Sequence, residues 1–208
     1  MRTPLAGARA VAFDLDDTLT DWFTGLREAA EAVGAPEILD RVRDETWVRR
    51  NGVVVDRHHW RVLHEPETFI PADLVEAFLA VLDPPLFDDV VPTLETLGAR
   101  LPLALLTNNP FGAEVLYRHG LHADVFDCVV IADPLVRKPD PRAFAPVIDA
   151  LELPPEAIAY VGDSIPADIE GALATGLLPI WLDRWNDPWP VPRGVVRITS
   201  LTELLEPC

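Results

Sequence analysis

Cysteine is nearly absent from this chain, and so is any long apolar run. The 208 residues include two cysteines, Cys128 and Cys208, which make no disulfide framework and fit a reducing cytoplasm. No run reaches the length of a membrane-spanning helix, and Met1 to Ala10 lacks the apolar stretch of a secretory signal. We therefore expect a cytoplasmic protein with one globular domain, or with a core that carries an insertion.

Positive charge is also scarce. The chain has 17 lysines and arginines against 34 acidic residues, which gives a net charge of −17 at pH 7. This balance argues against nucleic-acid binding, which needs a basic surface, and against binding to anionic membranes. A small phosphorylated ligand is still compatible with it, because screening over roughly 8 Å at physiological salt lets the local site decide.

Lysine itself occurs once, as Lys138, beside 16 arginines. A lysine supplies a compact point charge, whereas an arginine supplies a wide planar fork. Chance could leave one lysine at any position, so its place relative to the other motifs decides whether it has a role.

Apolar residues are plentiful at 49%, enough for a sizeable core. Short apolar runs end in polar residues and alternate with helix-like stretches. This order predicts an α/β fold, a Rossmann-like parallel sheet with helices on both faces. The main strand candidates are 10–13, 101–109, 127–133, 157–164 and 177–183, followed by a last short strand and helix after residue 194.

Polar residues at the ends of these runs are the candidates for a site. Ligands of such sheets bind beyond the carboxyl ends of the strands, where Asp14, Thr107 and Asp163 all fall. The stretch "PADIEGALATG" that follows Asp163 predicts a helix, with Pro166 in its first turn and Gly176 as its stop signal.

One connection is too long for an ordinary crossover. About eighty residues separate Thr20 from Leu101, and patterns such as "LVEAFLAVL" indicate helices within them. We predict a core domain formed by residues 1–20 and 92–208. Residues 21–91 would form a small helical cap domain inserted after the first strand.

The stretch "VAFDLDDTLT" places three aspartates within four positions. Asp14, Asp16 and Asp17 repel one another, and no cationic residue lies near them in sequence. Such crowding is costly unless a positive group, most simply a metal ion, relieves it.

With three further motifs, this stretch resembles the haloacid dehalogenase superfamily. "DLDDT", "LLTNN", "RKPDP" and "VGDSIPADIEGALATG" are similar to the family's four ordered motifs, and the inserted segment is similar to the helical cap of its phosphatase-like branch. The only lysine, Lys138, falls at the family's catalytic lysine position. The resemblance covers the whole predicted core.

The resemblance implies a Mg²⁺-dependent phosphatase that acts on a small phosphorylated metabolite. Asp14 would be the nucleophile that forms an aspartyl-phosphate, and Asp16 the general acid and then the general base. Thr107 and Asn108 would bind the phosphoryl oxygens. Lys138 would neutralise Asp14 and the transferring group.

The same resemblance implies a metal site. Asp14, Asp163 and the backbone carbonyl of Asp16 would hold Mg²⁺, and Asp168 would support the metal or Lys138 without binding the substrate. At Asp17 the commonest family form has glycine, so we assign this residue no chemistry and expect it to cap a turn.

Several alternatives stay open. A phosphomutase would return the phosphoryl group to a sugar, and a non-catalytic binding protein would use the fold alone. A dehalogenase would normally lack an acid such as Asp16. In the predicted cap, a cluster of arginines either forms a solvated face or includes one or two side chains that bind a second anionic group of the substrate. His58 and His59 are expected to be solvated. The cluster consists of Arg41, Arg43, Arg49, Arg50, Arg57 and Arg61.

Overall fold

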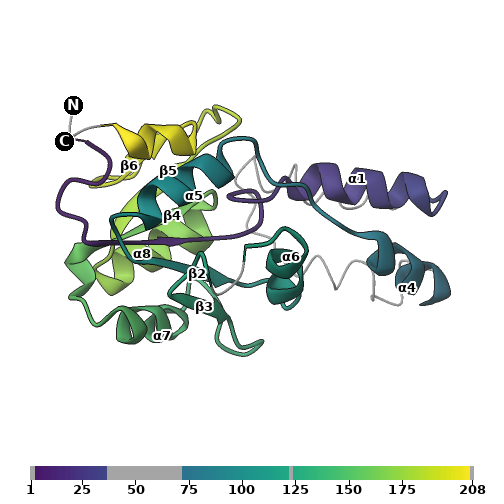
Figure 1. Ribbon diagram of the computed structural model, residues 1–208, viewed down its shortest axis with the longest axis horizontal. Helices are drawn as coiled ribbons and strands as arrows, with labels where there is room; N and C mark the ends of the chain where they lie inside the picture. Colours follow the sequence, from purple (N-terminus) through teal and green to yellow (C-terminus); the bar gives the residue numbers. More distant parts are fainter. Residues whose placement is uncertain (1–2, 37–71, 122–123, 207–208) are drawn as a thin grey trace. The chain divides into compact units, whose positions relative to one another are not determined.

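Six parallel strands form one sheet in the order β3-β2-β1-β4-β5-β6 (Figure 1). The computed structural model describes residues 3–36, 72–121 and 124–206. The predicted α/β fold with a parallel sheet is confirmed. The strands are β1 (Ala10–Phe13), β2 (Leu103–Thr107), β3 (Cys128–Ile131), β4 (Ile158–Gly162), β5 (Leu178–Leu182) and β6 (Val196–Ile198).

Both faces of the sheet are covered by helices. Side chains alternate along each strand, so Val11 and Phe13 of β1 pack in one apolar cluster, and Ala10 and Ala12 pack in another. The first cluster includes residues of α5 (Val90–Gly98), α6 (Gly112–Arg118) and η4 (Leu201–Leu205), and the second includes residues of α7 (Pro141–Leu151) and α8 (Glu170–Thr175). A strand buried on both faces reads as a continuous apolar run, which is why the sequence gives a strong strand signal here.

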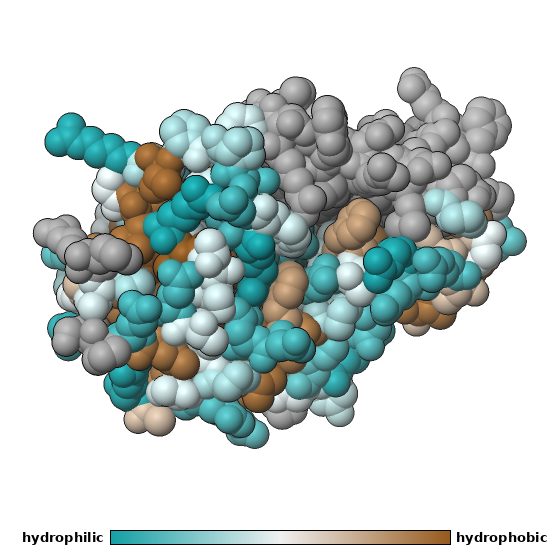
Figure 2. Space-filling model, turned by 90° about the horizontal axis from the view of Figure 1, so that it is seen from above, coloured by the Kyte–Doolittle hydropathy of each residue, from teal (hydrophilic) through white to brown (hydrophobic). Residues whose placement is uncertain are grey.

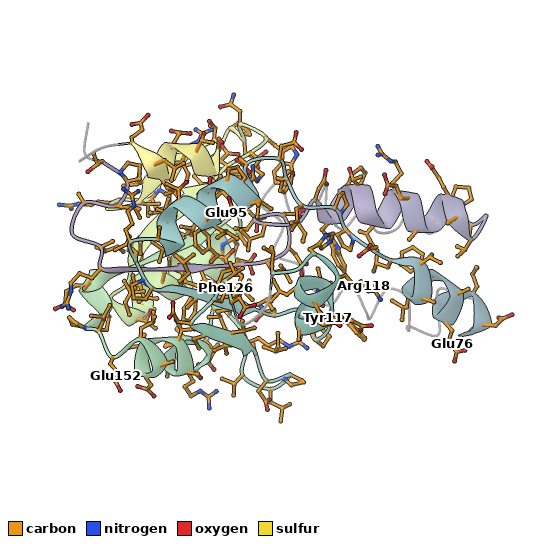
Figure 3. All side chains as sticks on the ribbon, viewed as in Figure 1. Glu76, Glu95, Tyr117, Arg118, Phe126 and Glu152 are labelled. Atoms are coloured by element: carbon orange, nitrogen blue, oxygen red, sulfur yellow. The ribbon has the colours of Figure 1, made fainter. Side chains whose placement is uncertain are left out.

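The helices of this layered core follow the strands in chain order (Figure 1). Their bounds are α5 (Val90–Gly98), α6 (Gly112–Arg118), α7 (Pro141–Leu151), η2 (Pro155–Ala157), η3 (Ile165–Ile169), α8 (Glu170–Thr175) and η4 (Leu201–Leu205). Figure 3 shows Phe126 in the packed interior beside β2, whereas Glu95 on α5 and Glu152 after α7 are exposed.

The direction in which the chain adds strands to the sheet changes at β1. The chain moves from β1 to β2 to β3 on one side, and then crosses to β4, which pairs with the other edge of β1. The carboxyl ends of β1 and β4 therefore border the crevice where ligands of doubly wound sheets bind.

The chain divides into two compact units, 1–20 with 86–208, and 21–85. In the second unit, α1 (Trp22–Ala32) packs with α4 (Ala72–Val81) around Trp22, Leu26 and Phe78. Asp21 begins α1, because its carboxylate accepts the N–H of Thr24 at 3.0 Å. The identification of this unit as a cap remains a prediction, and the arginine cluster, His58 and His59 lie outside the described residues.

Two local details differ from the predicted pattern. A π-helical turn, η3, precedes α8, so the predicted single helix after Asp163 has two parts. The apolar run 127–133 is typical of a buried strand, but β3 is an edge strand and leaves Cys128 partly exposed. Burial and the neighbouring Asp127 raise the pKa of the Cys128 thiol, which disfavours the reactive thiolate.

The surface of the described residues carries both polar and apolar groups. On the face shown in Figure 2, brown apolar groups are interspersed with teal polar ones. Large exposed apolar side chains such as Tyr117 and Leu135 belong to separate elements, and scattered apolar residues of this kind are normal on a folded protein. Among the described residues, no helix combines the length and apolarity that crossing a membrane requires.

Candidate active site

Three strand ends bring the predicted site residues together. Asp14 directly follows β1, and its N–H donates to Val161 O of β4 at 2.9 Å. Asp163 directly follows β4, and Thr107 is the last residue of β2. Because β2, β1 and β4 are parallel neighbours, all three residues lie at the carboxyl edge of the sheet, as predicted.

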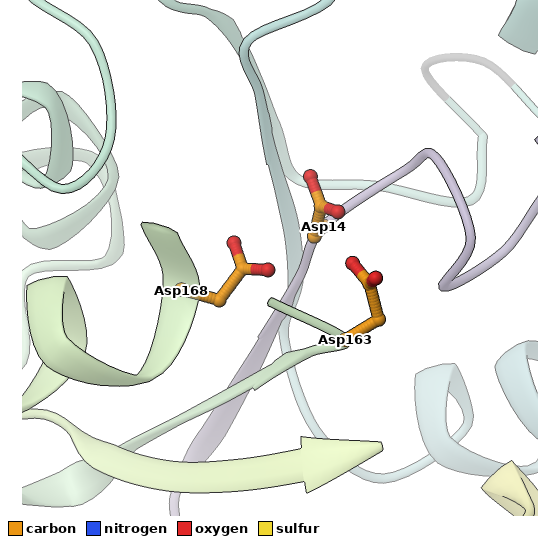
Figure 4. A group of neighbouring side chains, drawn as sticks. All are labelled: Asp14, Asp163 and Asp168. Atoms are coloured by element: carbon orange, nitrogen blue, oxygen red, sulfur yellow. The ribbon is translucent and has the colours of Figure 1, made fainter. Parts of the chain in front are cut away.

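Three carboxylates converge at this edge. Oxygens of Asp14, Asp163 and Asp168 lie within 4.8 Å of one another (Figure 4). Asp14 and Asp168 are 6% and 1% exposed, so water screens their charges poorly. Carboxylate oxygens are the ligands that Mg²⁺ takes from proteins, and the chemistry of this donor set therefore fits a divalent cation.

The contacts of Asp168 favour a supporting position. Its Oδ1 accepts the ammonium of Lys138 at 2.7 Å, and its Oδ2 accepts the N–H of Ser164 at 2.9 Å. Both oxygens are thus already hydrogen-bonded within the protein. The second oxygen of Asp14 has a longer contact, with Thr18 at 3.5 Å, and direct metal ligation by Asp14 and Asp163 remains a prediction.

Lys138 lies between the two buried acids. Its Nζ donates to Asp14 Oδ1 at 2.5 Å, to Asp168 Oδ1 at 2.7 Å and to the hydroxyl of Tyr160 at 3.0 Å. An ammonium has three protons, so these three acceptors use its full donor capacity. The side chain of Lys138 is 2% exposed, so water screens its charge poorly.

Burial and these contacts shift the pKa values of both partners. Burial alone would lower the pKa of Lys138, but the carboxylates of Asp14 and Asp168 hold its pKa well above the usual range. Burial raises the pKa of Asp14 to about 7, with Lys138 opposing the rise and the charges of Asp168 and Asp163 adding to it. One ammonium does not balance three carboxylates, and a divalent cation would supply the missing charge.

The backbone of Lys138 is fixed by Asn108. The N–H of Lys138 donates to Asn108 Oδ1 at 3.0 Å, and Asn108 Nδ2 donates to the carbonyl of Lys138 at 3.1 Å. The side-chain amide of Asn108 thus joins the end of β2 to the segment that carries the lysine. Its predicted contact with phosphate remains a prediction.

Asp16 has a different environment from Asp14. It is partly exposed, and its Oδ1 accepts Asn109 Nδ2 at 3.1 Å. The N–H of Asn109 donates to the hydroxyl oxygen of Thr107 at 3.0 Å, which leaves the proton of that hydroxyl for another acceptor. Asn109 therefore links two predicted site residues, a role that the sequence reasoning missed.

The loop after Asp14 is tightly folded. Asp17 has φ 60°, in the left-handed region that glycine adopts freely and aspartate tolerates. This conformation explains why glycine suits the position in the resembled family. The hydroxyl of Thr18 lies 3.5 Å from Asp14 Oδ2, at the limit of a hydrogen bond.

Two more polar contacts come from positions that look purely apolar in the sequence. Tyr160, within β4, contacts Lys138 and lies 3.2 Å from the carbonyl of Leu106, to which its hydroxyl can donate. Trp181, within β5, donates its indole N–H to the carbonyl of Asp163 at 3.0 Å. A polar atom on an aromatic residue of a buried strand is the only sequence signal that could have indicated them.

Gly162 makes room for Asp168. A Cβ at this last residue of β4 would lie 2.4 Å from Asp168 Cγ, closer than real Cβ atoms approach. The glycine of "VGDS" thus lets the acid from η3 reach Lys138.

Comparison with protein families agrees with this geometry. Residues 8–176 match the family described as haloacid dehalogenase-like hydrolase. The phosphoglycolate phosphatase of Yersinia pseudotuberculosis is 33% identical over 182 residues, which cover 81% of this chain and 78% of the relative.

Solved structures of two kinds share the fold. A HAD phosphatase from Thermococcus onnurineus is 26% identical with a TM-score of 0.67, over 94% of this chain and 95% of its own. A 2-haloacid dehalogenase from Pseudomonas syringae pv. Tomato is also 26% identical with a TM-score of 0.67, over 95% and 96%.

Proposed function

Because the chain belongs to the haloacid dehalogenase-like hydrolases, we propose that it hydrolyses a small phosphate monoester with Asp14 as the nucleophile. The observation that carries this proposal is the contact of Asp14 with the buried ammonium of Lys138, at the carboxyl edge where Asp163 and Asp168 converge. The relative from Yersinia, named as a phosphatase, supports the substrate class.

The first step is attack of Asp14 on phosphorus. The bond from the carboxylate oxygen to phosphorus forms as the bond to the leaving oxygen breaks, which gives an aspartyl-phosphate. Carboxylate and phosphate are both negative, and two unit charges 4 Å apart cost about 4 kcal/mol at an effective dielectric constant of 20. The ammonium of Lys138 offsets this repulsion and stabilises charge on the phosphoryl oxygens.

Asp14, Asp163 and the backbone carbonyl of Asp16 would hold Mg²⁺. When bound, this ion would supply Lewis-acid stabilisation of the phosphoryl oxygens and neutralise the carboxylate cluster.

Asp16 acts as the general acid in the first step and as the general base in the second. It gives a proton to the departing alkoxide and then takes one from the water that attacks phosphorus, so inorganic phosphate leaves and Asp14 is restored. Positioned proton transfer of this kind contributes roughly 10²–10⁴-fold. The hydrogen bond from Asn109 and the partial exposure of Asp16 suit a group that meets both substrate and water.

Two other reactions use similar parts. A dehalogenase would also attack with a carboxylate, and the structural likeness to a 2-haloacid dehalogenase makes it the second candidate. It releases halide and has no use for a second acid, so the presence of Asp16 beside Asn109 favours phosphate transfer. A phosphomutase would need a bisphosphate activator and would release no phosphate.

The test is phosphate release from a panel of phosphorylated metabolites and from a generic aryl phosphate, with Mg²⁺ present. Asp14→Asn should reduce turnover by more than about a hundredfold, since loss of a nucleophile is among the largest single-residue effects. Asp17→Asn is the matched control, because it removes a charge from the same loop and asparagine also tolerates φ 60°.

We expect Asp17→Asn to keep most of the activity. Equal losses in the two variants would contradict the assignment of Asp14. Halide release from a 2-haloacid without phosphate release would instead favour the dehalogenase.

A further inference from the structure

Arg184 lies outside the four motifs, two residues after the end of β5. Its guanidinium makes a bidentate ion pair with Asp89, at 2.9 and 3.0 Å, and Nη2 also donates to the backbone carbonyl of Thr18 at 2.8 Å. The same group lies 3.9 Å from the ring centroid of Phe87. The side chain of Arg184 is 9% exposed, so these contacts are shielded from water.

Arg184 therefore binds two chain segments at once. Thr18 belongs to the loop that follows Asp14, and Phe87 and Asp89 belong to the segment that returns the chain to the sheet. The two segments also pair directly, because the N–H of Phe87 donates to the carbonyl of Leu19 at 3.1 Å. The guanidinium is planar and has five donors, so it can hold a carboxylate and a carbonyl together as an ammonium cannot.

Asp89 is anchored on its other side. Its Oδ2 accepts the hydroxyl of Ser200 at 2.7 Å and the N–H of Leu201 at 2.9 Å, at the start of η4. The chain of contacts runs from η4 through Asp89 and Arg184 to the carbonyl of Thr18. The carboxylate is thus a fixed point, which can hold the guanidinium in place.

The loop that receives this contact needs support. The N–H groups of Thr18, Leu19 and Thr20 all point to the carbonyl of Leu15, while Asp17 takes a left-handed conformation. Unusual backbone conformations of this kind persist when surrounding contacts define them. Arg184 supplies such a contact at the residue that follows Asp17.

We propose that Arg184 is a positioning residue, which holds the Asp14–Thr18 loop in its active geometry through the carbonyl of Thr18. This inference rests on the proposed function, in which Asp14 and Asp16 of that loop carry out the chemistry. Arg184 acts on both residues through the backbone that joins them to Thr18, whose carbonyl it binds.

The experiment combines hydrogen exchange with kinetics on the full chain. Exchange of the amides at residues 15–20 is compared in the wild type, Arg184→Ala, Arg184→Lys and Val147→Ala, together with kcat and KM for a generic aryl phosphate. Val147→Ala is the matched control, because it opens the buried core on the opposite face of the sheet, away from the loop.

We expect Arg184→Ala to speed exchange of the loop amides by about tenfold or more and to lower kcat by roughly 10–100-fold, with KM nearly unchanged. Arg184→Lys should recover only part of both, since it keeps the charge without the fork. Val147→Ala should lose thermal stability while its loop exchange and kcat stay near those of the wild type.

Loop exchange or kcat in Arg184→Ala that changes no more than in Val147→Ala would overturn the proposal, as would full recovery by Arg184→Lys. If the wild type releases no phosphate, the proposed function fails. The exchange comparison then still decides whether Arg184 holds the loop.

Discussion

The surroundings of Lys138 restrict which side chain this position can hold. Its ammonium donates to three oxygens, from Asp14, Asp168 and Tyr160, and its side chain is 2% exposed. Apart from five histidines, every other basic residue of the chain is arginine. We therefore expect the site to require a compact cation, and a larger group with the same positive charge would not suffice.

Replacement of Lys138 by arginine should therefore nearly abolish activity. The planar guanidinium is wider than the ammonium and would displace Asp14 or the phosphoryl group, so we expect kcat to fall more than about a hundredfold. Steady-state phosphate release, with circular dichroism to verify folding, measures this. Arg118→Lys, an exchange in an exposed pair with Glu114, is the control and should behave as the wild type. Near-normal kinetics of Lys138→Arg would contradict the account.

The sequence could indicate some of these residues and not others. Asp14, Thr107 and Asp163 lie at the polar ends of apolar runs, where both strand periodicity and the family resemblance point. Lys138 was indicated by the resemblance and by its being the only lysine of the chain. Tyr160 and Trp181 lie within such runs, and apolar burial already explains them. Their polar contacts depend on the direction of one hydroxyl and one N–H, which no spacing in the sequence encodes.

At the level of whole elements, the turn between β4 and α8 places the second buried acid. Ser164 caps η3, where its carbonyl accepts both the N–H of Asp168 at 2.8 Å and that of Ile169 at 3.2 Å. The π-helical turn brings Asp168 back against Gly162 and Lys138. Such turns are frequent at functional sites, yet they differ from an α-helix by one shifted hydrogen bond, so the sequence predicted only a helix here.

Gly162→Ala tests this packing. The new Cβ would lie 2.4–2.6 Å from three atoms of Asp168, so the acid or the strand must shift. We expect kcat to fall roughly 10–100-fold and the free energy of unfolding to fall by about 1–3 kcal/mol.

Gly98→Ala is the matched control for that substitution. Gly98 ends α5, and a Cβ there would meet Leu103 in ordinary contact, with Cδ1 at 3.4 Å and Cγ at 4.0 Å, so this variant should keep its activity and lose no stability. Phosphate release and denaturant unfolding measure both variants. Wild-type activity in Gly162→Ala would show that Asp168 tolerates displacement.

The fold as a whole gathers three acids, two buried and one partly buried, at the site of one ammonium, and this concentration of charge should link metal binding to the stability of the protein. A ligand that binds only the folded state stabilises it by about 2.7 kcal/mol at a concentration 100 times its Kd. The parallel sheet with helices on both faces could be predicted from the apolar runs, whereas the strand order came from the structure. The net charge of −17 was equally plain, but it did not reveal where the acids converge.

Thermal unfolding with increasing Mg²⁺, against NaCl at the same ionic strength, measures this linkage. Tm of the wild type should rise with Mg²⁺ and return to its starting value with a chelator. Asp163→Asn should nearly eliminate the rise, because it removes a proposed direct ligand, and Asp168→Asn should retain part of it. The reverse order of the two variants would show that Asp168 is the direct ligand.

The central claim is that Asp14 carries the phosphoryl group during turnover. Acid quenching within the first turnover on an aryl phosphate, followed by peptide mapping by mass spectrometry, tests it directly. The account predicts the mass of one phosphoryl group on the peptide that contains Asp14, present with Mg²⁺ in the wild type and absent from Asp14→Asn. Phosphate release with no labelled peptide at any quench time, or with the label on another residue, would contradict it.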